Sequence, residues 1–315
     1  MCNILFIKKV ALPDFFASRL VRVMPTFLLF IAVLLAYSAT LQPHRFTPSL
    51  HEILATVTFL RTYVPYDLSL SNKGWAIGHL WSLNVEEHSY LFLALVALLT
   101  RRAKNPWLTG TCLVIATASA WTVSQWYLVH PPGGASHFST RTEVASLGLL
   151  AGATIRYVRH YLPLSLYSKV PGWLPLACVA VAFSCFSTYQ YKGFHITLAP
   201  ILLACAINFL DRTPEIARAA LSTRALRWFG TCSFSLYLWQ QPLHVLTTEY
   251  GANAFLMCAS AIAIGALSFY VFENPVRKYL TTAWRNRSSS AKPELVNALS
   301  IQASGEARLI GAIKD

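Results

Sequence analysis

One stretch of the sequence combines acidic, hydroxyl and imidazole side chains at the spacing of a helix. It spans residues 79–90 and runs without a break into an apolar segment at residues 91–99, and the residues that could do chemistry together are His79, Ser82, Glu86, Glu87 and Tyr90. At 100° per residue, four of these residues fall within an arc of roughly 80°, and Glu87 lies just beside it. The sequence therefore predicts a helix with a polar stripe along one face.

Two adjacent acidic residues are unusual on an apolar helix. Placing an acidic residue at the centre of a membrane helix costs about 2.5–3.5 kcal/mol, so Glu86 and Glu87 are not expected to face lipid. They could bind Arg or Tyr partners on neighbouring helices and hold the bundle together. Alternatively, one of them takes or orients a proton near a sugar hydroxyl, as a general base does. The residues alone leave both interpretations open.

The composition indicates which elements must position this stripe. Of the 315 residues, 55% are hydrophobic and 12% charged, whereas soluble domains carry about 25% charged residues. Continuous apolar runs of close to 20 residues are typical of transmembrane helices. We therefore predict an all-α, polytopic transmembrane helix bundle of about eight spans, at residues 24–41, 78–99, 107–129, 143–158, 172–189, 196–210, 228–248 and 254–272.

The basic residues predict an orientation for this bundle. The net charge is +13, and with a cytoplasmic N-terminus 21 of the 26 Lys and Arg residues lie in cytoplasmic segments. This agrees with the positive-inside rule and places both termini in the cytoplasm and the chain in the inner (plasma) membrane. The charge is then explained by orientation and by attraction to anionic membrane lipid, so no nucleic-acid partner is expected. The predicted outward cations are Arg45, Arg61, Lys73, Arg141 and Lys192.

Two parts are expected along the chain. Residues 1–282 form the membrane domain, and residues 283–315 are polar and form a cytoplasmic tail. The seven cysteines show no Cys/His spacing of a metal site, so they are interpreted as small apolar core residues and no metal is expected.

A family resemblance is carried by the polar stripe and by further segments in the same order. The string Trp81-Ser82-Leu83-Asn84-Val85-Glu86-Glu87, ending at Tyr90, resembles a signature of the acyltransferase 3 family. Members of that family are integral-membrane enzymes that transfer acyl groups to envelope and secreted carbohydrates. Co-occurrence in order is stronger evidence than a single motif. The other similar segments are residues 15–25 (with Arg19, Arg22 and Pro25), 140–151 (with Arg141 and Glu143), 229–242 (with Tyr237 and Gln240) and 273–277 (Glu273-Asn-Pro-Val-Arg277).

The resemblance implies a reaction and a set of site residues. An acetyl or other acyl group would move from cytoplasmic acyl-CoA to a carbohydrate hydroxyl of the cell envelope or of an exported glycan. Arg141 is expected to form an ion pair with Glu86 or Glu87, because a buried acid needs a counter-charge, or else to bind the acceptor sugar. The expected catalytic residues are Glu86, Glu87 and His79, the expected substrate-binding residues are Arg141, Ser82, Tyr90 and Gln240, and Arg19 and Arg22 would meet the phosphates of acyl-CoA.

The chain also departs from the family pattern. Two helices that begin that pattern, with an Arg and a His that is its leading candidate base, are not found in this sequence, so we expect a shortened family member with little or no activity by itself. His88, Ser89 and Gln240 stand where other residues are usual. Two alternatives remain open: an inactive paralogue, or a transporter or flippase. A transporter would be indicated by two-fold internal similarity, which the sequence does not show.

Overall fold

Long apolar runs form helices in this protein, as the sequence predicts. The computed structural model describes residues 2–41, 49–63, 76–103, 105–132, 138–187 and 193–287, and every regular element within these ranges is a helix. Each of the eight predicted spans coincides with one helix or with two consecutive helices. The predicted all-α fold is therefore confirmed.

The helices differ in length and in apolar character. Among the described residues, three are long and apolar enough to cross a membrane, at Leu12–Thr40, Pro106–Val129 and Ala254–Arg287, and shorter apolar helices cover Leu174–Phe186 and Phe194–Asn208. The longer elements are α1 (Leu12–Leu41), α3 (Trp81–Arg101), α4 (Pro106–Val129), α6 (Leu147–Tyr161), α8 (Leu174–Ser187), α9 (Phe194–Asn208), α11 (Arg224–Tyr250) and α12 (Ala254–Ser268). The short ones are η1 (Asn3–Ile7), α2 (Leu50–Val57), η2 (Gly78–Leu80), η4 (Phe138–Thr140), α5 (Thr142–Ala145), α7 (Leu164–Tyr167), η5 (Leu210–Arg212), α10 (Glu215–Leu221) and η6 (Phe269–Glu273).

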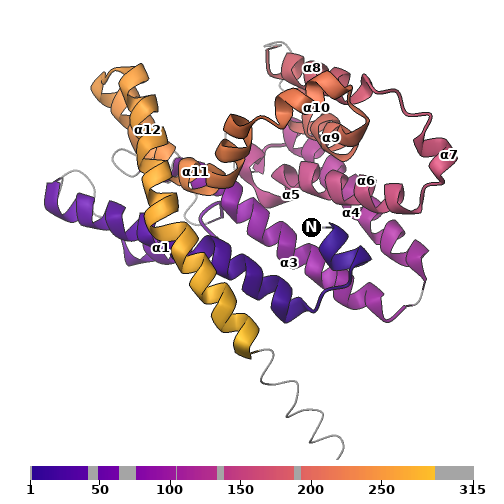
Figure 1. Cartoon of the computed structure of the whole chain (residues 1–315), viewed down its shortest axis with the longest axis horizontal. Helices are drawn as coiled ribbons and strands as arrows, with labels where there is room; N and C mark the ends of the chain where they lie inside the picture. The colour runs from indigo at the N-terminus through magenta and orange to yellow at the C-terminus, as the bar shows by residue number, and fades with distance from the viewer. Residues whose placement is uncertain are drawn as a thin grey trace, which may run out of the picture.

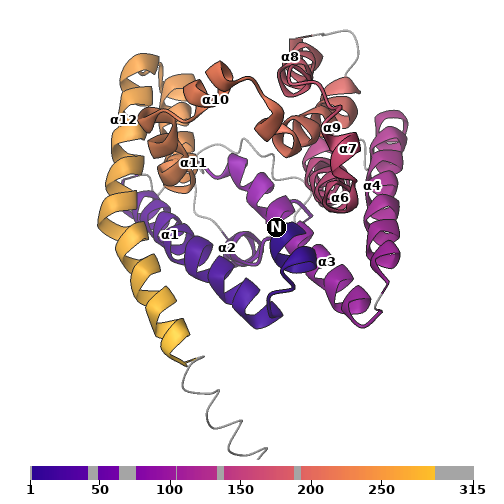
Figure 2. The ribbon, with the colours of Figure 1, turned by 45° about the vertical axis from the view of Figure 1, so that its right-hand side comes forward.

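α3 is the central element of the bundle. Figures 1 and 2 both show α1, α11 and α12 on one side of it and α4, α6, α8 and α9 on the other. Because other helices lie on both sides of α3, side chains on its opposite faces contact different sets of helices. This arrangement places the polar stripe and His88 on separate sides of the same helix.

Three helix boundaries differ from the prediction. α1 begins at Leu12 rather than at residue 24, because a buried face continues through Phe15, Val23 and Phe27 at helical spacing. The predicted span 143–158 is divided at Ser146 into α5 and α6. The helix that starts with α12 continues to Arg287, so the first residues of the predicted tail at 283–315 are helical and the others lie outside the described residues.

α11 and α12 pack closely at Gly265. A Cβ atom at this position would lie 2.7 Å from Leu236 Cδ2 and 3.0 Å from Leu236 Cα, so moving one side chain could not relieve the clash. We predict that Gly265→Ala lowers the free energy of unfolding by about 1–3 kcal/mol, as overpacking does. Thermal unfolding of the protein in detergent measures this.

Gly230 of α11 provides the matched control, because a Cβ there meets no atom within 4 Å. Gly230→Ala should be neutral or stabilising by up to about 1 kcal/mol through helix propensity. Equal stability of the two variants would contradict the close packing of α11 on α12.

Candidate active site

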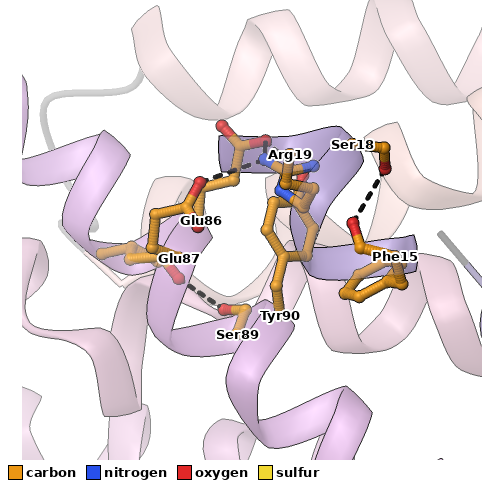
Figure 3. Close-up of polar contacts among 8 residues, drawn as sticks. Phe15, Ser18, Arg19, Glu86, Glu87, Ser89 and Tyr90 are labelled. Carbon is orange, nitrogen blue, oxygen red and sulfur yellow. Dashed lines mark hydrogen bonds and ion pairs between the residues drawn. The ribbon is translucent and has the colours of Figure 1, made fainter. Parts of the chain in front are cut away.

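A single arginine connects α1 to the acids of α3. Arg19 lies on the same face of α1 as Phe15 and Val23, and its side chain points toward α3 (Figure 3). Its Nη2 lies 2.9 Å from Glu86 Oε1 and 3.2 Å from Glu87 Oε1. The guanidinium carbon is 3.4 Å from the centre of the Tyr90 ring, and the Tyr90 hydroxyl donates a hydrogen bond to Glu86. We call Arg19, Glu86, Glu87 and Tyr90 the Arg19 cluster.

The two acids of the Arg19 cluster are not equivalent. The side chain of Glu86 is 40% exposed and that of Glu87 is 20% exposed, whereas Arg19 is 14% exposed. Glu86 uses Oε1 for both Arg19 and Tyr90, and its Oε2 has no hydrogen-bond partner among the described residues. With one cation for two carboxylates, the cluster carries a formal charge of −1. Glu86 therefore offers an accessible carboxylate oxygen that could accept a proton.

A second polar group lies where α3 begins. The Tyr237 hydroxyl of α11 donates to the backbone carbonyl of His79 at 2.5 Å and lies 2.9 Å from the Ser82 hydroxyl. The His79 ring packs edge-on against Phe30 and Tyr237, with ring centres 5.9 and 4.7 Å apart. Within the described part of the chain, its buried nitrogens make no hydrogen bond of ordinary geometry, and neither does Nε1 of Trp239. The polar stripe thus faces α1 and α11, and His79 lies apart from the two acids.

Comparison with known proteins shows which family this arrangement belongs to. A family model described as "Acyltransferase domain", that of the acyltransferase 3 family, matches residues 1–272. The chain belongs to the acyltransferase 3 family. It is therefore a membrane protein of an acyltransferase family, and the recognition made from the motifs is confirmed.

Two relatives illustrate the similarity. The peptidoglycan O-acetyltransferase OatA of Listeria monocytogenes is 25% identical over 291 residues, which are 85% of this chain and 46% of that protein. The O-acetyltransferase OatA of Staphylococcus aureus is 24% identical over 298 residues, which are 86% of this chain and 48% of that protein. The chain thus spans about half the length of these relatives. No solved structure matches it significantly.

In this acyltransferase 3 chain, the cation beside the acids is not the predicted one. Arg141 Nε lies 2.6 Å from Glu143 Oε1, so the expected ion pair between Arg141 and Glu86 or Glu87 is wrong. Arg141 has an acid two residues away and is the N-cap residue of α5, which packs on the face of α3 that carries His88. Glu86 and Glu87 instead meet Arg19, which was expected at the cytoplasmic face.

Two further residues expected at the site lie outside the Arg19 cluster. Arg22 is exposed on α1, and its charge acts on Glu273. Gln240 is exposed on α11 and makes no hydrogen bond within the described part of the chain. The face of α11 that meets the bundle at this level carries Leu238 and Trp239 instead.

The buried Glu273 joins the two closing family motifs. Its side chain is 2% exposed, accepts a hydrogen bond from Ser235 at 2.6 Å, and lies 3.6 Å from Arg277. Ser235 belongs to the motif on α11, and Arg277 follows on the helix that begins with α12. The sequence identified both motifs but not their contact. Tyr237 was also missed as a site residue, although it lies within the motif at residues 229–242.

Outside the polar stripe, a further ion pair links the last turn of α6 to η5. Arg159 Nη2 lies 2.5 Å from Asp211 Oδ2. Burial alone would raise the pKa of Asp211, but hydrogen bonds from Tyr167 and Arg159 outweigh it and hold that pKa below its usual value. Asp211 is therefore an ionised, arginine-paired acid outside the polar stripe.

Proposed function

We propose that this protein transfers an acetyl or other acyl group to a hydroxyl of a cell-envelope carbohydrate, and that the Arg19 cluster is its reactive site. The observation that carries the proposal is the pairing of Arg19 with Glu86 and Glu87, because it joins two family motifs that lie far apart in the sequence. The printed names of the relatives, O-acetyltransferases of which one acts on peptidoglycan, support a carbohydrate acceptor.

The cluster suits the proton transfer that such a reaction needs. Glu86 Oε2 would accept the proton of the acceptor hydroxyl while that oxygen attacks the acyl carbonyl carbon. The carbon–sulfur bond of the thioester donor breaks, and the leaving thiolate takes up a proton. A positioned base contributes about 10²- to 10⁴-fold to such a step. Arg19 would hold Glu86 in place, and its charge would help to stabilise the negative charge that develops on the carbonyl oxygen.

The donor and the orientation are part of the same proposal. Acyl-CoA would approach from the cytoplasm, where both termini lie by the positive-inside rule. Because Arg19 is engaged by two carboxylates, its position favours a role at the reacting groups, whereas the exposed Arg22 on the same helix is better placed for donor phosphates. His79, Ser82, Arg141 and Gln240 remain candidates for the acceptor side.

A transfer assay tests the proposal. Membranes from a bacterial strain without its own O-acetyltransferases, with or without this chain, would be incubated with radiolabelled acetyl-CoA and cell-wall carbohydrate. We expect label that is covalently bound to the carbohydrate and released by mild base, as an ester is. Such transfer would also overturn the expectation that the chain alone has little activity.

The other outcomes separate the alternatives. Label that enters sealed vesicles without becoming bound to carbohydrate would contradict the proposal and favour a transporter. Folded, membrane-inserted protein that gives no transfer would contradict it as well, and would favour an inactive paralogue.

A further inference from the structure

A cavity lies on the side of α3 opposite the Arg19 cluster. It has a volume of about 610 Å³ and is bounded by α3, α4, α5 and α6. None of the residues of the Arg19 cluster lines it. The cavity is therefore separate from the site proposed for acyl transfer.

The lining of this cavity changes from polar to apolar along its length. At one end, Glu143 accepts hydrogen bonds from Tyr63 at 2.6 Å and from Arg141 at 2.6 Å. Beside them, His88 Nδ1 lies 2.8 Å from the Thr142 hydroxyl. Toward the other end the walls are apolar or small, and they include Phe92, Val96, Cys112, Ala116 and Leu150. This distribution matches an elongated molecule with one polar end.

The cavity has the dimensions of one hydrocarbon chain in one leaflet. From His88 to Val96 it follows α3 for about 12 Å, and from Cys112 to Val123 it follows α4 for about 16 Å, at 1.5 Å per residue. Half of the roughly 30 Å hydrocarbon thickness of a bilayer is comparable. Phe92 and Ile115, both exposed, line the cavity, so it is open at a surface that lipid reaches in a membrane-spanning bundle.

The polar end favours an uncharged hydrogen-bonding group. Glu143 and Arg141 neutralise each other at 2.6 Å, so this end has little net charge to attract an ion. Burial raises the pKa of Tyr63, and its hydrogen bond to Glu143 adds to this, so the phenol remains neutral. Nε2 of His88 has no hydrogen-bond partner among the described residues and can bind an ester oxygen.

We propose that this cavity binds one acyl chain of a membrane glycerophospholipid, with the ester group of that chain at His88. The chain would enter sideways between α3 and α4. The bound lipid would fill the space between α3 and the helices α4, α5 and α6.

Photo-crosslinking tests this proposal. The full chain would be placed in phosphatidylcholine vesicles that contain a phosphatidylcholine with a diazirine on one acyl chain, and the crosslinked peptides would be mapped. We expect crosslinks to concentrate on residues 92–96 and 112–123. Ala116→Phe should reduce them roughly ten-fold or more, since one methylene in an apolar pocket changes binding by about 10- to 200-fold. Because Ala116 also packs on core residues, Ser119→Phe, at an exposed lining position, provides a second variant.

Ala118→Phe is the matched control, because Ala118 is exposed on the same helix and does not line the cavity. It should leave the crosslinks unchanged. Crosslinks spread evenly over the exposed residues of α4, and unaffected by Ala116→Phe and Ser119→Phe, would show ordinary lipid contact and overturn the proposal. Competition by a long-chain fatty alcohol but not by unlabelled phosphatidylcholine would overturn the choice of a glycerophospholipid.

Discussion

Replacing Arg19 by alanine should lower the free energy of unfolding by about 1–3 kcal/mol, a value between those of exposed and buried ion pairs. The variant would leave Glu86 and Glu87 without their cation, and it would remove the guanidinium that stacks on Tyr90. The partial exposure of Glu86 keeps the loss below that of a fully buried pair. Thermal unfolding in detergent at constant pH and salt measures the effect.

Arg22→Ala is the matched control for this prediction, because Arg22 is an exposed cation on the same helix. It should change the unfolding free energy by no more than about 0.5 kcal/mol, as most surface substitutions do. In a Glu86→Gln/Glu87→Gln background, Arg19→Ala should lower the free energy of unfolding clearly less than it does in the wild-type protein, since the substitution then leaves no acid unpaired. An identical cost in both backgrounds would mean that the ion pairs contribute nothing to stability.

Replacing Glu86 by glutamine should lower acyl transfer by about 10²- to 10⁴-fold, the usual contribution of a positioned base. Glutamine preserves the shape of the side chain but has no carboxylate to accept the proton. The rate of label transfer from acetyl-CoA to cell-wall carbohydrate measures the effect. Asp211→Asn removes an acid that is also paired with an arginine, at 2.5 Å, but lies outside the site, and it should leave transfer unchanged. Equal losses of acyl transfer in Glu86→Gln and Asp211→Asn would contradict the prediction, because they would show a general effect of removing an acidic charge.

Much of the fold could be predicted from the sequence, because membrane helices depend on local composition. Uninterrupted apolar runs locate the helices, and 100° per residue aligns Ser82, Glu86 and Tyr90 on one face. The same geometry turns His88 away from them, and the structure places His88 against Thr142. These features require only the helix itself and no knowledge of its neighbours.

The partner of the acids could not be predicted in the same way. Arg19 and Glu86 are 67 residues apart, and their contact depends on the rotation and axial offset of α1 relative to α3. A signal for it was present, because Arg19 continues the i, i+4 series of Phe15, Val23 and Phe27, all buried. This signal was overlooked because the positive-inside rule already explains an arginine near the cytoplasmic side of the membrane. Arg141 was chosen instead for its predicted side of the membrane, whereas Glu143 neutralises it locally.

The most direct test of the central claim, that Arg19 and Glu86 act together in acyl transfer, is the transfer rate of Arg19→Ala, Glu86→Gln and the double variant. Residues that act as one unit are non-additive, because removing either already removes the function of both. We expect each single variant to lose most of the transfer, and the double variant to be no slower than the slower single one. Losses that multiply in the double variant, or an Arg19→Ala variant that is folded and fully active, would contradict the claim.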